Sequence, residues 1–176
     1  MMSLHVRLML GFLLAGLSGG CASGSEARDQ SSKASAPSSK KERIALKADL
    51  PELPEGAGPI DADAPEEFTR TGSGLYYRIL RKSGGRRPRE VERVVAHYKG
   101  WLDNGTQFDS SYDRGEPSEF PLTQVVPGWT EGLQLIGVGG MIELQVPPRL
   151  GYAAMPHPGI PPNSTLHFII ELKDIK

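Results

Sequence analysis

The C-terminal part of the chain alternates between apolar and polar residues, which is typical of β-strands with one buried face. Strands are expected at residues 75–80, 94–102, 141–146 and 166–172, with one more around Phe108. Within the second of these strands, the face expected to be buried carries Val94, Ala96 and Tyr98. Asp103-Asn104-Gly105 predicts a tight turn after this strand, because Asn and Gly tolerate positive φ angles.

One segment between the strands has the apolar spacing of a helix. Pro127 and Gly128 open it, Gly137 ends it, and the apolar residues between them are Trp129, Leu133 and Ile136. A long loop rich in Pro and Gly follows at residues 147–163. Several strands around one short helix predict an α+β domain built on an antiparallel sheet, which we place at residues 71–176.

The residues before this domain are predicted to lie outside it. Residues 22–43 are rich in Ser, Ala and Lys, and they cannot bury enough apolar surface to offset the entropy of ordering. From residue 44 to 67, prolines interrupt an acidic stretch, which favours an extended and semi-rigid spacer. We therefore expect residues 21–70 to be a flexible linker, a disordered tether in front of the domain.

Charge is distributed unevenly along a chain whose net charge is −1. Residues 48–67 carry seven acidic side chains and no Lys or Arg, whereas residues 78–93 carry seven basic side chains against two acidic ones. One interpretation is a solvated tail and a solvated loop, the usual setting of charge runs. The other is a contact between the two segments, or between the basic segment and anionic lipid. The near-neutral total argues against a dedicated nucleic-acid-binding protein.

The first 20 residues have the pattern of a secretory signal peptide. The apolar run at residues 8–17 is too short to span a bilayer and is followed by small residues. Cys21 is the only cysteine of the chain, and Leu17-Ser18-Gly19-Gly20-Cys21 resembles a bacterial lipobox, although Leu17 stands one position early. This resemblance implies a lipid on Cys21, whereas an ordinary signal cleaved nearby is the alternative. With no Asp after Cys21, we expect a periplasmic protein secreted across the inner membrane and anchored to the outer membrane.

Aromatic residues in separate predicted elements are placed so that they can wall one small, nearly uncharged pocket. They are Tyr98, Phe108, Trp129, Tyr152 and Phe168, and Asp109 lies beside one of them. Enzymes that break covalent bonds usually show a nucleophile, a general base or metal ligands, and this part of the chain offers mainly an apolar cup. Such a cup suits a reaction that needs only rotation about a bond, as when a proline is bound and its preceding amide rotates.

Four runs of residues resemble the motifs of FKBP-type peptidyl-prolyl cis–trans isomerases. They are His97-Tyr98-Lys99-Gly100, the segment from Gly105 to Ser111, the segment from Pro127 to Gly132, and the segment from Tyr152 to Leu166. The likeness extends from Leu75 to the C-terminus with few changes of spacing. It implies a five- or six-stranded antiparallel sheet curled around a single short helix, with the active pocket between helix and sheet.

The same resemblance implies roles for individual residues. Trp129 would form the floor under the proline ring, and the walls would be Tyr98, Phe108, Val125, Val126 and Phe168. The Tyr152 hydroxyl could donate to a substrate carbonyl, and the backbone N–H of Val126 could bind a second carbonyl. Taken singly, each aromatic residue would be interpreted as ordinary core, but their joint arrival at the motif positions favours the pocket.

Asp109 falls at the family position where a carboxylate faces the twisting amide. Tyr98 and Arg114 are its expected neighbours and would keep it ionised. A turn-stabilising ion pair between Asp109 and Arg114 is the alternative, and both interpretations can hold together. His157 and Ile160 belong to the loop over the pocket rim and are expected to shape substrate choice.

Two positions depart from the family pattern. Ser118 stands where the family often has an aromatic rim residue, so one wall of the pocket is expected to be thinner. Ala153 follows Tyr152 where Gly is usual, which restricts that turn. These departures put binding of macrolide ligands in doubt more than they do activity.

The rest of the sequence argues against a metal or cofactor site and leaves one alternative function. The four histidines have no metal-like spacing, so we expect no metal site and no cofactor. The expected partners are unfolded or partly folded polypeptides that contain proline, bound by a monomer. The alternative is a non-catalytic module or periplasmic chaperone that holds proline-containing segments without turnover.

Overall fold

The computed structural model describes residues 49–176, which form one antiparallel sheet and one α-helix. The helix α1 spans Pro127–Leu133, and the short 3-10 helices η1 and η2 span Leu122–Gln124 and Pro148–Leu150. The strands are β1 (Thr69–Arg70), β2 (Tyr76–Arg81), β3 (Arg93–Leu102), β4 (Gln107–Ser110), β5 (Ser118–Pro121), β6 (Met141–Val146) and β7 (Leu166–Ile175). The predicted α+β class is confirmed, and the long strands begin within one residue of their expected positions.

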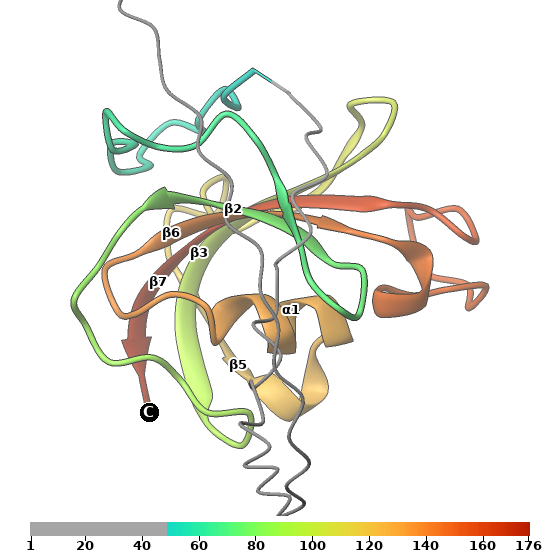
Figure 1. The fold of residues 1–176 in the computed structure, drawn as a ribbon. Helices are drawn as coiled ribbons and strands as arrows, with labels where there is room; N and C mark the ends of the chain where they lie inside the picture. Colours follow the sequence, from blue (N-terminus) through green and yellow to red (C-terminus); the bar gives the residue numbers. More distant parts are fainter. Residues whose placement is uncertain (1–48) are drawn as a thin grey trace, which may run out of the picture. The chain divides into compact units, whose positions relative to one another are not determined.

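The strands lie in the order β1-β2-β6-β7-β3-β4, and β5 also pairs with β3. Two short strands share one edge of β3, because Lys99–Trp101 pair with β4 and Arg93–Ala96 pair with β5. The described part of the chain therefore has seven strands, where five or six were expected. The strands that were not expected individually are β1, a two-residue strand paired with β2, and β5, which pairs with β3. Figure 1 shows the sheet with α1 packed against one face.

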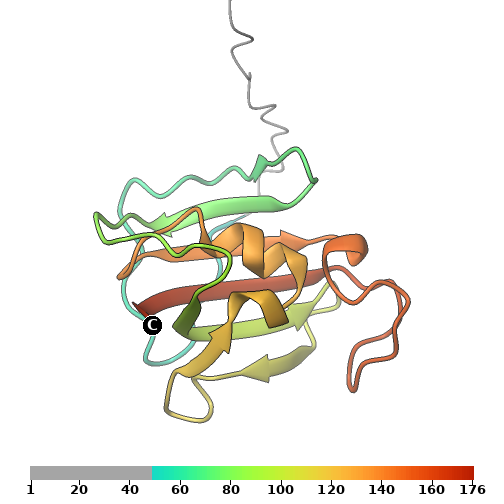
Figure 2. The ribbon, with the colours of Figure 1, turned by 90° about the horizontal axis from the view of Figure 1, so that it is seen from below.

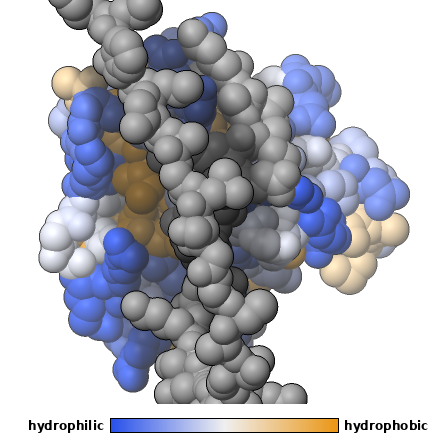
Figure 3. All heavy atoms as spheres, in the orientation of Figure 1, coloured by the Kyte–Doolittle hydropathy of each residue, from blue (hydrophilic) through white to orange (hydrophobic). Residues whose placement is uncertain are grey.

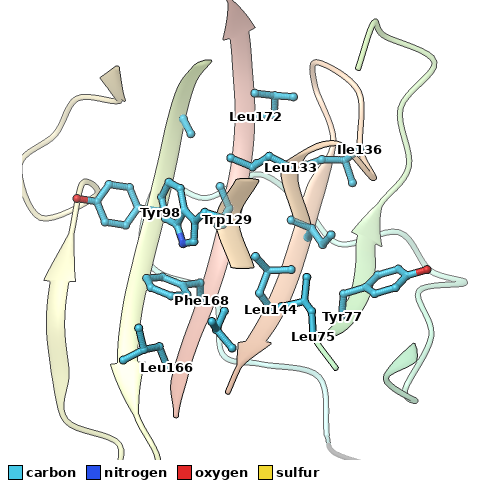
Figure 4. Packing of buried hydrophobic residues seen from close by; sticks show 14 of the residues in the cluster. Leu75, Tyr77, Tyr98, Trp129, Leu133, Ile136, Leu144, Leu166, Phe168 and Leu172 are labelled. Carbon is cyan, nitrogen blue, oxygen red and sulfur yellow. The ribbon is translucent and has the colours of Figure 1, made fainter. Parts of the chain in front are cut away.

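The main hydrophobic core lies between α1 and the sheet. As the alternation predicted, Val94, Ala96 and Tyr98 of β3 are all at most 5 % exposed. Leu166, Phe168, Ile170 and Leu172 of β7 face the same core. Figure 4 shows core side chains of these strands, with the Trp129 indole next to the rings of Tyr98 and Phe168.

Two glycines allow α1 to lie close to β6. A Cβ atom at Gly128 would lie 2.6 Å from the Val146 side chain, and one at Gly132 would lie 2.7 Å from the Leu144 side chain. Real Cβ atoms do not approach neighbours this closely, so a larger residue would push the helix away from the sheet. The short distance between helix and sheet fixes how deeply Trp129 sits.

The helix is shorter than its apolar spacing predicted. It ends at Leu133 rather than before Gly137, because the next backbone bonds join residues three apart, from Leu135 N–H to Gly132 O and from Ile136 N–H to Leu133 O. Trp129, Leu133 and Ile136 are nevertheless all buried in the same core, so the predicted face is confirmed.

The other face of the sheet is covered by residues 49–68, which we call the strap. Leu53, Ala57 and Ile60 of the strap pack on three fully buried residues of the sheet, Leu80, Met141 and Ile169. In Figure 1 the strap lies on the side of the sheet opposite α1. Figure 3 shows the same orientation, in which hydrophilic residues form much of the margin and hydrophobic ones gather in a strip between them.

The strap corrects the expectation that residues up to 70 are a flexible linker outside the domain. Proline and acidic residues suggested a solvated spacer, but the few apolar residues among them find an apolar patch on the sheet. The expected signal peptide at residues 1–20, the lipid attachment at Cys21 and the linker up to residue 48 lie outside the described residues.

Arg78 of β2 anchors both ends of the strap. Its Nη1 and Nη2 atoms donate to the backbone oxygens of Glu66 and Asp49 at 3.0 and 2.7 Å, and its guanidinium lies 4.7 Å from the centre of the Phe68 ring. Its Nε atom donates to Glu143 of β6 at 2.5 Å. Arg78 is only 2 % exposed, so this is a buried ion pair.

A second anchor holds the middle of the strap. Glu171 of β7 accepts hydrogen bonds from the Gly58 N–H at 2.9 Å and from Arg81 Nη2 at 2.7 Å. Lys82 also pairs with Asp63, which lies in the same acidic stretch. The acidic and the basic segment of the sequence are therefore in contact, as one of the two interpretations of the charge pattern predicted.

Candidate active site

A pocket of about 200 Å3 opens between α1 and the sheet. Its lining comes from β3, β4, β5, β7, the segment from η1 to the start of α1, and the loop after η2. The lining residues are Tyr98, Phe108, Asp109, Phe120, Gln124, Val125, Val126, Trp129, Tyr152 and Phe168. Every aromatic residue that the sequence analysis singled out for a common pocket lies in it, together with Asp109.

The Trp129 indole forms the floor and is 4 % exposed. The rings of Tyr98, Phe120 and Phe168 meet it nearly at right angles, with centroids at 5.1, 5.4 and 5.3 Å. Edge-to-face contacts of this kind are favourable for aromatic rings and fix their orientation. The indole Nε1 has no hydrogen-bond acceptor among the described residues. The result is a rigid apolar cup with a single unused donor at its base.

Gly100 explains why the strand motif before the turn ends in glycine. A Cβ atom at this position would lie 2.6 Å from the Phe108 ring and 2.9 Å from the Phe168 ring. These two rings meet edge to face at 5.6 Å directly beside the strand. Any side chain at Gly100 would displace one wall of the pocket.

Asp109 is held at the pocket wall by two donors. The Tyr98 hydroxyl donates to its Oδ2 atom, and Arg114 Nη1 donates to Oδ1 at 2.6 Å. Arg114 Nη2 also donates to the Tyr98 hydroxyl at 2.9 Å and to Ser118 Oγ at 3.2 Å. Burial opposes ionisation of Asp109, but the bonds from Tyr98 and Arg114 outweigh it and leave its pKa below the ordinary value. Asp109 is therefore a carboxylate, and Arg114 stands behind it rather than in the pocket lining.

The two pocket tyrosines stay protonated. Burial, followed by the hydrogen bond to Asp109, raises the pKa of Tyr98 to about 12. Burial, followed by the nearby Asp109 charge, also raises the pKa of Tyr152. Neither the Tyr152 hydroxyl nor the Val126 backbone N–H bonds to any acceptor among the described residues. Both are donors available to a bound molecule.

His157 and Ile160 lie beside the pocket rather than in its lining. The His157 ring stacks on the Tyr152 ring with centroids 4.0 Å apart, and Ile160 is buried at 5 % exposure. They belong to the loop between η2 and β7, which extends beyond the edge of the sheet in Figure 2. Ala153, next to Tyr152, has a φ angle of 51°, so the turn is in the left-handed region that the usual Gly would adopt without strain.

Sequence reasoning missed Phe120 and Gln124. Ser118 predicted a thinner wall, but Phe120, two residues further along β5, points to the same side and supplies an aromatic ring. Ser118 instead bonds to Arg114. The alternation of Ser118 and Phe120 was the available signal. It was obscured because the strand has only four residues, follows Pro117 and ends in Pro121.

The described residues carry little other chemistry. A hollow of about 420 Å3 lies under the strap, but it is lined by opposite charges, among them the paired Arg78 and Glu143. Within residues 49–176, no group of three or more His, Cys, Asp and Glu side chains is arranged to hold a metal ion. No helix in this range is long and apolar enough to cross a membrane.

Comparisons with known proteins identify the family of this domain. The model of the FKBP-type peptidyl-prolyl cis-trans isomerase family matches residues 84–173. The FKBP-type peptidyl-prolyl cis-trans isomerase FkpA of Escherichia coli K12 is 50 % identical over 114 residues, which are 64 % of this chain and 42 % of FkpA. The FKBP-type 22 kDa isomerase of the same organism is 44 % identical over 123 residues, covering 69 % of this chain and 60 % of that protein.

Solved structures show the same relationship. The crystal structure of Escherichia coli FkpA matches with a TM-score of 0.60 at 49 % identity, over 62 % of this chain and 51 % of that one. A peptidyl-prolyl cis-trans isomerase from Pseudomonas syringae pv. tomato matches with a TM-score of 0.58 at 31 % identity, over 62 % and 80 %. The chain thus spans about half the length, or less, of the FkpA proteins that it matches. The matched domain includes the whole pocket, and the chain belongs to the FKBP-type peptidyl-prolyl cis–trans isomerase family.

Proposed function

We propose that this domain accelerates cis–trans isomerisation of Xaa-Pro bonds by binding the proline ring on Trp129. The observation that carries the proposal is the combination of an apolar aromatic pocket with one ionised carboxylate, Asp109, held in its wall. Phe108, Phe120, Val125, Val126 and Phe168 would surround the ring as walls.

The energetics fit a pocket without acid–base or nucleophilic machinery. Rotation about a prolyl amide has a barrier of roughly 18–20 kcal/mol, because the amide loses its resonance at mid-rotation. No bond breaks, so the site needs only to bind the twisted amide better than the planar one. Lowering the barrier by about 5 kcal/mol accelerates the reaction several-thousand-fold.

Asp109 supplies the electrostatic part of this discrimination. The planar amide places extra negative charge on its carbonyl oxygen, whereas the twisted amide returns that charge to nitrogen. A carboxylate facing the carbonyl therefore disfavours the planar form relative to the twisted one. Tyr98 and Arg114 would hold Asp109 ionised and in place while the amide passes through its twisted form.

Two donors would orient the substrate chain. The Tyr152 hydroxyl and the Val126 N–H are both unused among the described residues, and both belong to pocket-lining residues. Bonds to substrate carbonyls would keep the prolyl ring against Trp129 while the preceding residue turns. His157, stacked on Tyr152, and the buried Ile160 of the same loop would set the shape of the rim and so the choice of substrate.

A protease-coupled assay on a peptide with an apolar residue before proline tests the proposal. Wild-type protein should accelerate isomerisation, and Trp129→Ala, Asp109→Val and Tyr152→Phe should each reduce kcat/KM by about tenfold or more, equivalent to at least ~1.4 kcal/mol. Trp101→Leu is the matched control, because Trp101 packs on the opposite face of the sheet, at the strap. It should leave activity unchanged.

Two results would contradict the proposal in different ways. Full activity in a protein that carries all three pocket substitutions would refute the site. A wild-type protein without measurable isomerisation that still assists refolding of a proline-containing protein would favour a non-catalytic binding module or chaperone. Stability of each variant, measured by urea unfolding, separates loss of the site from loss of the fold.

We also propose that the protein works in the periplasm, anchored to the outer membrane through a lipid on Cys21. The support is the sequence alone, namely the signal-like residues 1–20 and the lipobox-like run before Cys21. Cys21→Ser should move the protein from the membrane fraction to the soluble fraction, whereas Ser23→Ala should not. A wild-type protein already in the soluble fraction would refute the anchor. We further propose a monomer, which sedimentation of the soluble variant would test.

A further inference from the structure

Ser111 ties the end of one strand to the middle of another directly behind the pocket. It follows β4 and is fully buried. Its backbone N–H donates to the Tyr98 carbonyl at 2.9 Å, and its Oγ accepts from the Tyr98 N–H at 2.8 Å. The Oγ atom also lies 3.0 Å from His97 Nδ1 and 3.3 Å from the backbone carbonyl oxygen of Tyr98. One serine thus bonds to both backbone polar groups of Tyr98.

The side chain of Ser111 takes the place of a missing strand neighbour. The pairing of β3 with β4 covers Lys99, Gly100 and Trp101 and stops before Tyr98. At Tyr98 the chain after β4 still donates one backbone bond to the Tyr98 carbonyl, but the Tyr98 N–H bonds to the Ser111 Oγ atom. A buried N–H without an acceptor is costly, and the Ser111 hydroxyl satisfies it.

This arrangement closes a short ring of contacts through the site. The Tyr98 hydroxyl donates to Asp109, Asp109 is two residues before Ser111 in the chain, and Ser111 returns to the Tyr98 backbone. Both ends of the Tyr98–Asp109 contact are therefore fixed to the same serine. A shift of Ser111 would change the separation between the phenol and the carboxylate.

We propose that Ser111 is a positioning residue, which sets the geometry of the Tyr98–Asp109 pair from behind the pocket. This rests on the proposed isomerase function. Ser111 is not part of the pocket lining and cannot touch a bound proline, so its effect on the reaction passes through Tyr98 and Asp109.

A double-mutant cycle tests the proposal. Ser111→Ala should lower kcat/KM by about tenfold in the wild-type background and by less than about twofold in the Asp109→Asn background. Ser111→Thr keeps the hydroxyl and should recover most of the loss. Ser110→Ala is the matched control, because Ser110 is also buried but its Oγ accepts from Asp113 N–H instead. It should affect stability without changing kcat/KM.

A second measurement does not depend on turnover. In Ser111→Ala the Tyr98 bond to Asp109 weakens, so the pKa of Asp109 should rise toward its ordinary value, as followed by carboxyl carbon NMR in the folded protein. An unchanged Asp109 titration, or an equal loss of kcat/KM in both backgrounds, would overturn the proposal. If Ser111→Ala does not fold, Ser111→Cys gives the same two readings, since it fills the space but weakens the bond. A shifted Asp109 titration in a protein whose wild type lacks isomerase activity would refute the proposed function and leave the positioning role standing.

Discussion

Replacing Glu143 by Gln should destabilise the domain by about 3–5 kcal/mol, because it removes one charge of a buried ion pair. Arg78 and Glu143 meet at 2.5 Å, with side chains only 1 % and 7 % exposed. Gln preserves the shape of the side chain and one hydrogen-bond acceptor. The expected loss is therefore mainly that of the charge–charge interaction between Arg78 and Glu143, which is little screened by salt because both side chains are buried.

The chain offers a matched control for this change. Arg93 and Glu119 also meet at 2.5 Å between strands, but their side chains are 50 % and 43 % exposed. Glu119→Gln should therefore cost at most about 1 kcal/mol. The two free energies of unfolding are measured by urea titration with tryptophan fluorescence, at low and high salt. Only the exposed pair should weaken as salt is raised.

Similar losses of unfolding free energy in Glu143→Gln and Glu119→Gln would refute the reasoning, because burial would then not affect how much an ion pair contributes to stability. A double variant, Arg78→Met with Glu143→Leu, separates the charge from the other contacts of Arg78. Removing both charges should recover part of the loss. The remainder measures how strongly Arg78 holds the strap through Asp49 and Glu66.

Three further predictions concern backbone conformation, pH and the pocket wall. Gly74→Ala should cost about 1–3 kcal/mol in urea unfolding, because Gly74 has a φ angle of 86° and its Cβ would meet Arg149, whereas Gly72→Ala, in open space, should be nearly neutral. The pKa of Glu171 is lowered in the folded state, since bonds from Arg81 and Gly58 outweigh burial. The unfolded state therefore binds more protons as pH falls. The free energy of unfolding of wild type should exceed that of Glu171→Gln by its maximum amount above about pH 4.5, and this difference should shrink as pH falls. A difference that grows on acidification would contradict the lowered pKa. Phe120→Ala should reduce kcat/KM by about tenfold through loss of one ring beside Trp129, and an unchanged value would exclude Phe120 from the site.

Much of the fold could be predicted because its longest strands follow simple periodic patterns. In β3, buried and partly exposed residues alternate from Val94 to Leu102, and the turn after it carries Gly105 with a φ angle of 81°. The resemblance to the FKBP-type family then predicted that separate motifs surround one pocket. The periodicity of a single strand cannot predict such a contact between distant segments. The aromatic residues come from elements far apart in the sequence, and only the sheet brings them together.

The strap escaped prediction for an identifiable physical reason. Its contacts are single apolar side chains, such as Leu53 and Ile60, and backbone groups held by arginines and glutamates of distant strands. Such a segment has no periodicity of its own, and its proline and acid content is that of a solvated spacer. A buried Arg78 or Glu171 could not be recognised either, because charged residues on an outer strand face are usually exposed.

The position of β7 in the sheet bears on when the domain can acquire its structure. This strand is made of residues 166–175, yet it lies between β6 and β3 and also supplies the carboxylate that captures Gly58, 113 residues earlier. The two halves of the sheet cannot be joined, and the bond between Glu171 and Gly58 cannot form, before β7 is available. Such high contact order makes assembly slow and leaves a growing chain without a stable core. The sheet of this domain is therefore completed only after β7 has been synthesised.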